Sequence, residues 1–196
     1  MNSFRFKNLK EIPGLLIDLR YQSRDNFTGE KLYTDSFQAQ LQEVAFEKIQ
    51  KAAHELAETH PQLRLLILDA LRPRSVQRRL YRFVEGTPQQ SYVANPDRGS
   101  VHNFGMAVDL TLAKANGEEL DMGTPFDDFS DLAQPQLESR FYKQGEISAQ
   151  QLENRHLLRD LMLGAGFTGI PNEWWHFNAL TFDALVGKYS ILETEI

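Results

Sequence analysis

Hydrophobic residues recur at spacings of three and four in several stretches of the chain, the period of an α-helix that buries one face. The first such stretch follows Asp35 and ends at Pro61. The same spacing predicts helices over 75–83 and over 150–163, the latter followed by two closely spaced glycines. A short helix is expected over 182–189. The helical pattern therefore divides the chain into well-separated blocks.

Strand-like patterns fill the intervals between these blocks. Residues 15–21 are predicted to form a short strand. Residues 63–71 form an almost unbroken apolar run, as expected for a strand covered on both faces. Residues 106–112 alternate, so Asp109 shares one side of its strand with small side chains while aliphatic side chains take the other. An aromatic run over 173–177 is the fourth predicted strand.

Glycine, proline and polar residues mark the loops. Residues 86–99 form a loop that delivers the chain to His102. Residues 115–118 contain an Asn-Gly turn signal, which predicts a hairpin. Residues 121–129 are dense in glycine, proline and acids and are expected to form an ordered loop. Its carboxylates could receive a substrate ammonium group or could simply be solvated.

Composition narrows the class of protein. At 196 residues the chain is expected to form one domain, 1–196, with a core that needs no disulfide. A net charge of -6 argues against nucleic-acid binding, and the absence of cysteine excludes a cysteine nucleophile or thiolate-bound metal. Charged residues interrupt the apolar residues of 1–17, and no apolar run reaches about 18 residues. We therefore expect a cytoplasmic protein without a membrane partner.

Two short segments carry candidate metal chemistry. His102 lies just before the predicted strand over 106–112 and Asp109 lies within it, with a glycine between the two. Glu173 precedes His176 by three positions in the aromatic run. Two histidines and one aspartate can bind a catalytic zinc ion and leave one position for water. A neighbouring unligated glutamate can accept the proton of that water. A structural alternative remains open, with Asp109 paired to Arg72 and His176 held in the core between tryptophans.

The role of Glu173 depends on local geometry. In a regular strand over 173–177, Trp174 and His176 would share one face, and Glu173 would point away from His176. A catalytic Glu173 therefore requires a bend after residues 171–172.

Arg72 and Tyr21 each have two interpretations. Arg72 follows a buried strand and precedes Pro73, so its guanidinium could stabilise an oxyanion or bind a carboxylate, or could pair with Asp69. Tyr21 lies at the exit of the predicted strand over 15–21 and could reach a site, although a role in the core is favoured.

These segments resemble the zinc D-alanyl-D-alanine dipeptidases associated with vancomycin resistance, within the wider group of D,D-carboxypeptidase-like metallopeptidases. The wider group shares the S-x-H-x-x-G-x-A-x-D pattern, complete from Ser100 to Asp109, and the E-x-x-H pattern from Glu173 to His176. Three further stretches resemble the dipeptidase branch: 18–21 with 26–29, 69–73 and 121–127. One departure is Leu71, where the branch commonly has an aromatic residue.

The resemblance implies a single α+β metallopeptidase domain with a mixed or antiparallel central sheet, flanked by helices and carrying the zinc site. It also implies roles for eight residues: His102, Asp109 and His176 as ligands of one zinc ion; Glu173 as general base and acid; Arg72 as stabiliser of the tetrahedral intermediate; and Tyr21, Ser100 and Asp127 as substrate contacts. In this scheme Asp127 reaches the free amino group and the substrate carboxylate lies near Ser100.

The expected function is hydrolysis of the free dipeptide D-alanyl-D-alanine to two D-alanines. One alternative is a D,D-carboxypeptidase or endopeptidase that acts on longer cell-wall peptides. Another is a domain of the same fold that binds a metal or ligand without catalysis. The sequence leaves the oligomeric state, the bound metal and the physiological role open.

Overall fold

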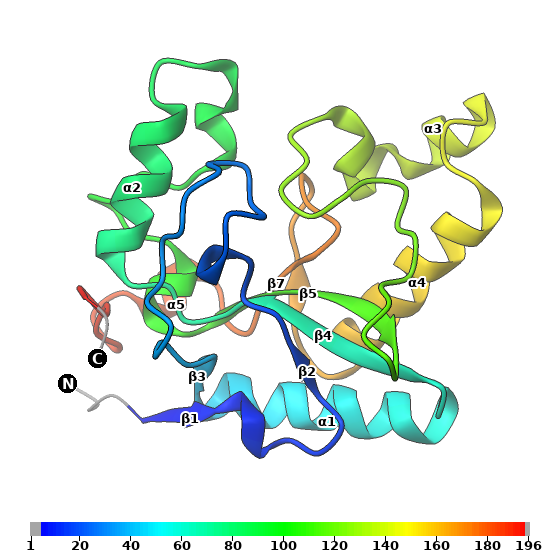
Figure 1. Ribbon diagram of the computed structural model, residues 1–196, viewed down its shortest axis with the longest axis horizontal. Helices are drawn as coiled ribbons and strands as arrows, with labels where there is room; N and C mark the ends of the chain where they lie inside the picture. Colours follow the sequence, from blue (N-terminus) through cyan, green and yellow to red (C-terminus); the bar gives the residue numbers. More distant parts are fainter. Residues whose placement is uncertain (1–4, 195–196) are drawn as a thin grey trace.

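The computed structural model describes residues 5–194, which form a compact α+β domain around a mixed sheet (Figure 1). The strand order in this sheet is β2-β4-β5-β7-β6, where β2 is parallel to β4 and the other neighbours are antiparallel. These strands are β2 (Leu16–Ile17), β4 (Leu63–Asp69), β5 (Ala107–Lys114), β6 (Thr168–Gly169) and β7 (His176–Asn178). A separate antiparallel pair consists of β1 (Phe6–Asn8) and β3 (Gln40–Gln42). The expected α+β fold with a mixed sheet is confirmed.

Helices surround the sheet. In Figure 1 the long helix α1 runs below the sheet, and it packs against both β4 and α4. The helices are α1 (Glu43–Thr59), α2 (Arg74–Val84), α3 (Glu138–Gln144), α4 (Ala149–Gly164) and α5 (Phe182–Leu185). Short 3-10 helices span Leu9–Glu11, Arg20–Gln22, Pro88–Tyr92, Val101–Phe104, Asp131–Ala133 and Pro135–Leu137. The ends of the predicted domain, 1–4 and 195–196, lie outside the described residues.

Burial explains the arrangement of the main elements. Five residues of α1 are buried and face the core, and four of them recur at spacings of three and four: Ala45, Ile49, Ala52 and Leu56, with Phe46 beside Ala45. All residues of β5 except Lys114 are buried, because β5 is the middle strand of the sheet. A polar side chain carried by β5 is therefore held rigidly and away from bulk water.

The structure confirms several predicted elements and corrects others. The helices predicted over 75–83 and 150–163 are α2 and α4, and β4 and β5 match their predicted strands. The helix expected from Asp35 begins only at Glu43, because residues 40–42 pair with β1 instead. The strand expected over 15–21 is limited to β2, and Tyr21 lies in a 3-10 helix.

Corrections cluster near the C-terminus. Only His176–Asn178 form the last predicted strand, while residues 173–175 lie outside it. The helix expected over 182–189 is confined to α5. The turn expected at 115–118 is present, but its returning arm makes only one isolated antiparallel bridge, between Ala113 and Glu119.

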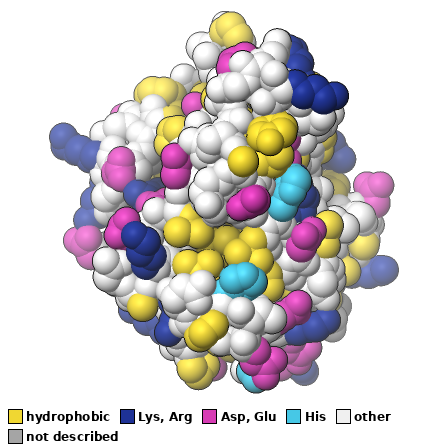
Figure 2. Space-filling view, turned by 90° about the vertical axis from the view of Figure 1, so that its right-hand side faces the viewer, with side chains coloured by type: hydrophobic (Ala, Val, Ile, Leu, Met, Phe, Trp, Pro, Cys, Tyr) yellow, Lys and Arg dark blue, Asp and Glu magenta, His cyan; other side chains and the backbone are white. Residues whose placement is uncertain are grey.

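The face that includes α3 and α4 has hydrophobic side chains gathered in its hollow centre, with charged side chains around them (Figure 2). Leu63, Leu120 and Leu157 line a groove beside α4, and the residues expected to act in catalysis line a different cavity. None of the helices in residues 5–194 is long and apolar enough to span a membrane.

Candidate active site

A cavity of about 350 Å³ collects the predicted site residues. All eight of them line it: Tyr21, Arg72, Ser100, His102, Asp109, Asp127, Glu173 and His176. They come from loops, from the 3-10 helices and from strands β5 and β7, which only the tertiary structure brings together. The sequence motifs that are far apart along the chain therefore meet in one place.

Local structure around His102 explains the spacing of its motif. The Ser100 hydroxyl accepts a hydrogen bond from the His102 backbone N–H at 3.3 Å and caps the 3-10 helix that carries the imidazole. Gly105 ends this helix with a positive φ of 67°, and a Cβ there would lie 3.2 Å from the backbone nitrogen of Gln42. The chain can thus turn directly from His102 into β5, which carries Asp109.

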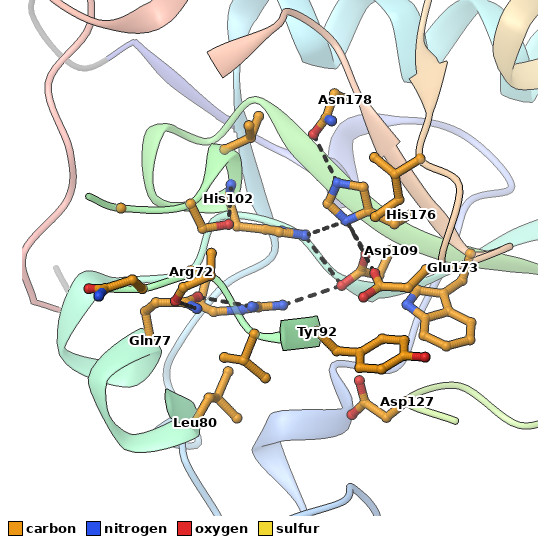
Figure 3. Close-up of a pocket in the computed structure, with 18 of the residues that line it drawn as sticks. Arg72, Gln77, Leu80, Tyr92, His102, Asp109, Asp127, Glu173, His176 and Asn178 are labelled. Atoms are coloured by element: carbon orange, nitrogen blue, oxygen red, sulfur yellow. Dashed lines mark hydrogen bonds and ion pairs between the residues drawn. The ribbon is translucent and has the colours of Figure 1, made fainter. Parts of the chain in front are cut away.

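Three potential ligand atoms converge at the sheet. Asp109 and His176 are register partners in β5 and β7, and one Asp109 carboxylate oxygen lies 3.0 Å from His176 Nδ1. The other oxygen lies 3.3 Å from His102 Nε2, which is itself 3.2 Å from His176 Nδ1 (Figure 3). These three residues are buried, and one ligand atom from each lies within 4.8 Å of the others. They form a possible metal-binding triad.

The second nitrogen of each imidazole supports this interpretation. His102 Nδ1 lies 2.7 Å from the Ala70 carbonyl oxygen, so this nitrogen carries the proton that it donates there. His176 Nε2 lies 2.9 Å from Oδ1 of Asn178 and donates in the same way. In the neutral rings, His102 Nε2 and His176 Nδ1 then present lone pairs toward the Asp109 carboxylate. Three buried lone-pair donors facing one another fit a divalent cation.

Electrostatic interactions within the triad oppose the effect of burial. Burial alone would raise the pKa of Asp109, but the neighbouring His102 and His176 hold that pKa far below its usual value. Burial lowers the pKa of His176, but hydrogen bonding to Asp109 and its charge outweigh this effect, so the pKa of His176 is raised. Asp109 is therefore an anionic ligand candidate throughout the neutral range.

Glu173 lies at the bend that its predicted role requires. It precedes β7 and has a carboxylate oxygen 3.9 Å from His176 Nδ1. Burial raises its pKa to about 7. Trp175, rather than Trp174, lines the cavity with His176, so the strand-based assignment of faces was wrong. The assignment failed because residues 173–175 lie outside strand β7.

Arg72 both pairs with Asp69 and reaches the cavity, so the two interpretations of this residue are compatible. Its guanidinium forms an ion pair with Asp69 at 2.7 Å and lies 3.3 Å from an Asp109 oxygen. Gln77 accepts a further hydrogen bond from it at 3.0 Å, and the Tyr33 hydroxyl donates to Asp69 at 2.6 Å. The same guanidinium lines the cavity. Arg72 is therefore a buried, ion-paired cation beside the triad, and its catalytic role stays a prediction.

Tyr21 and Asp127 form a pair on the cavity wall. The Tyr21 hydroxyl lies 3.1 and 3.2 Å from the two carboxylate oxygens of Asp127. Burial and the charge of Asp109 raise the pKa of Asp127 well above its usual value. Figure 3 shows Asp127 apart from His102 and His176, on another side of the cavity. Tyr21 belongs both to the core and to the site, so its two interpretations are compatible.

Sequence reasoning missed several cavity residues, among them Gln77, Arg98 and Asn178. Asn178 could have been found from its position two residues after His176, because alternate residues of a strand share a face. Arg98 lies in the loop before Ser100, with its guanidinium 4.5 Å from the centre of the Phe182 ring. No carboxylate pairs with Arg98 in the described part of the chain. It is thus a cation available at the cavity.

Comparison with known proteins places the chain in a class. A model of peptidase family M15, described as D-ala-D-ala dipeptidase, matches residues 3–190, and the chain belongs to this family of metallopeptidases. A D-alanyl-D-alanine dipeptidase of Escherichia coli (strain K12) is 35% identical over 181 residues, covering 91% of this chain and 87% of the relative. One from Enterococcus faecium is 31% identical over 187 residues, covering 85% and 86%.

Proposed function

We propose that this protein is a zinc-dependent dipeptidase that hydrolyses D-alanyl-D-alanine to two D-alanines. The observation that carries the proposal is the position of Glu173, a largely buried carboxylate 3.9 Å from Nδ1 of His176, the nitrogen that faces Asp109. The triad of His102, Asp109 and His176 would hold one zinc ion per chain. When bound, zinc supplies a Lewis acid that polarises a carbonyl group and lowers the pKa of a coordinated water molecule.

Glu173 transfers the proton in this scheme. Its carboxylate takes a proton from the attacking water and returns it to the amine that leaves when the peptide bond breaks. A pKa of about 7 suits both halves of this exchange, because neither protonation state is strongly favoured near neutral pH. The products are a free carboxylate and a free amine, so no further reactant is needed.

Arg72 contributes positive charge where the oxyanion develops. Its ion pairs with Asp69 and Asp109 hold the guanidinium in a fixed orientation before substrate arrives. One preorganised donor of this kind is typically worth about 3 kcal/mol of transition-state stabilisation.

The two charged ends of the dipeptide meet different walls of the cavity. Asp127, with Tyr21 beside it, receives the ammonium group, because it supplies a part-buried carboxylate apart from the triad. The substrate carboxylate lies near Ser100, and Arg98, two residues earlier in the same loop, supplies an unpaired positive charge for it. A cavity of about 350 Å³ is at the small end of ligand sites, which favours a dipeptide over a longer peptide. A cytoplasmic location stays a prediction from the sequence.

The test is release of D-alanine from D-alanyl-D-alanine by the zinc-loaded protein, beside the N-acetylated dipeptide and the L,L isomer. We expect hydrolysis of the free D,D dipeptide alone. Preferential cleavage of the N-acetylated dipeptide would instead support the carboxypeptidase alternative. No hydrolysis of any substrate, with one equivalent of zinc bound, would contradict the proposed activity and favour a binding domain.

A further inference from the structure

Asp127 lies in a loop and has an unfavourable backbone conformation. It has a φ of 63°, a left-handed conformation that costs a non-glycine residue free energy and persists only where surrounding contacts impose it. Its carboxylate is also part-buried near Asp109 and Glu173, an environment that raises its pKa. The position of Asp127 therefore depends on whatever holds this loop.

The buried guanidinium of Arg155, from helix α4, contacts both ends of the loop. Its Nε donates to the Met122 carbonyl oxygen at 2.6 Å, and Nη1 donates to the Leu132 carbonyl oxygen at 3.0 Å. Asp127 lies midway between these two anchor points. The Arg155 side chain is fully buried and pairs with the Glu138 carboxylate at 3.5 Å. One rigid planar group thus sets the separation of the loop ends.

The same guanidinium is linked to the segment that carries Glu173. It lies 5.9 Å from the centre of the Trp174 ring, and the indole N–H of Trp174 donates to Thr124 of the loop at 2.8 Å. Arg155, Trp174 and Thr124 therefore connect α4, the loop and the residue next to Glu173.

Helix α4 reinforces the same end of the loop with two neighbouring side chains. Gln151 donates to the Asp121 carboxylate at 2.8 Å, and Asn154 donates to the Asp121 carbonyl oxygen at 2.9 Å. Residues 151, 154 and 155 share one helix face, as expected for spacings of three and four. Gly123 passes close to this face, where a Cβ would lie 3.5 Å from an Arg155 nitrogen.

We propose that Arg155 is a positioning residue: by fixing both ends of the loop, it places Asp127 for the substrate ammonium group. This inference rests on the proposed function, in which Asp127 binds that group. A lysine at this position keeps the charge but presents one nitrogen, so it cannot reach both carbonyl oxygens with the geometry of a guanidinium. Loss of one anchor lets Asp127 relax from its left-handed backbone and weakens ammonium recognition.

The experiment compares Arg155→Lys with a matched control, Arg159→Lys, in the zinc-loaded protein. Arg159 lies on the same helix and its guanidinium donates to the same Glu138 carboxylate at 2.8 Å, but within residues 5–194 it forms no hydrogen bond to the loop. Two ligands are used: D-alanyl-D-alanine, and N-propionyl-D-alanine, which has the same skeleton without the amino group. We expect Arg155→Lys to raise the KM for the dipeptide about tenfold with kcat nearly unchanged. The Ki of N-propionyl-D-alanine should stay within about twofold, and the control should change neither constant.

Hydrogen exchange of the amides in 121–132 supplies a readout without turnover. Exchange should accelerate in Arg155→Lys and not in Arg159→Lys. If Arg155→Lys does not fold, Thr124→Val tests the Trp174 link in the same assays, with a smaller change in the same direction. Equal losses for both ligands, or unchanged exchange in the loop, would overturn the inference. If the unmodified protein cleaves no dipeptide, the proposed function and the ammonium role both fail, while exchange still reports whether Arg155 holds the loop.

Discussion

Nε2 of His102 lies 3.2 Å from Nδ1 of His176, and the opposite nitrogen of each ring contacts an oxygen atom. For His102 that oxygen is the Ala70 carbonyl, which no side-chain substitution removes. For His176 it is the Asn178 side chain. The orientation of one ligand candidate is therefore set by the backbone, and that of the other by a replaceable side chain.

Replacing Asn178 should weaken metal binding. Asn178→Ala removes the acceptor that keeps the proton of His176 on Nε2, so we expect zinc affinity to fall about 10- to 100-fold. Asn178→Asp keeps an acceptor and should retain or increase affinity. Competition with a chromophoric zinc chelator measures both. Asn116→Ala, in the exposed turn after β5, is the control, and equal affinity in all variants would show that Asn178 does not orient the ligand.

Replacing Glu173 should separate metal binding from turnover. Glu173→Gln preserves the shape of the side chain but removes the proton acceptor, so kcat should fall by about 10²- to 10⁴-fold while one zinc ion remains bound. Steady-state kinetics and metal analysis on the same preparation check the two parts. Near-normal turnover with zinc bound would show that another group accepts the proton.

The metal-free protein should lose stability as pH rises toward neutrality. Burial raises the pKa of Glu173 from 4.5 to about 7, so the folded protein keeps a proton that the unfolded chain has already released. Unfolding between these values releases that proton, and the free energy of unfolding falls with rising pH by at most about 3 kcal/mol. Urea denaturation with a chelator should show a shallower fall for Glu173→Gln. Exposed Glu146→Gln should keep the original slope, and identical slopes in all three proteins would contradict this assignment.

Removing the charge of Arg98 should weaken substrate binding more than catalysis. Arg98→Ala is expected to raise the KM for D-alanyl-D-alanine about tenfold with little change in kcat, because the guanidinium lines the cavity and is not part of the triad. Arg98→Lys should recover part of the loss. Arg82→Ala, an exposed arginine on α2, is the control. A KM that is the same for Arg98→Ala and Arg82→Ala would place the substrate carboxylate elsewhere.

The position of Glu173 relative to His176 depends on a bend before β7 that the local sequence pattern does not predict. The aromatic alternation around His176 predicts a strand that would turn Glu173 away, yet the strand begins only at His176. Its start is determined by pairing with β5 and β6, which the local pattern does not contain. Arg72 shows the same limit, because its two buried carboxylate partners come from different strands.

The sequence by itself determined the main helices, the two long strands and the motif that turns His102 into β5. Helical and strand periods depend on burial of one face, and capping by Ser100 and Gly105 involves residues close along the chain. Only the tertiary structure decided that Asn178 contacts His176, and that Arg155 reaches the Asp127 loop although it lies 33 residues after Met122 in the sequence. These contacts depend on the packing of whole elements, because distant segments meet only after the sheet and helices have assembled.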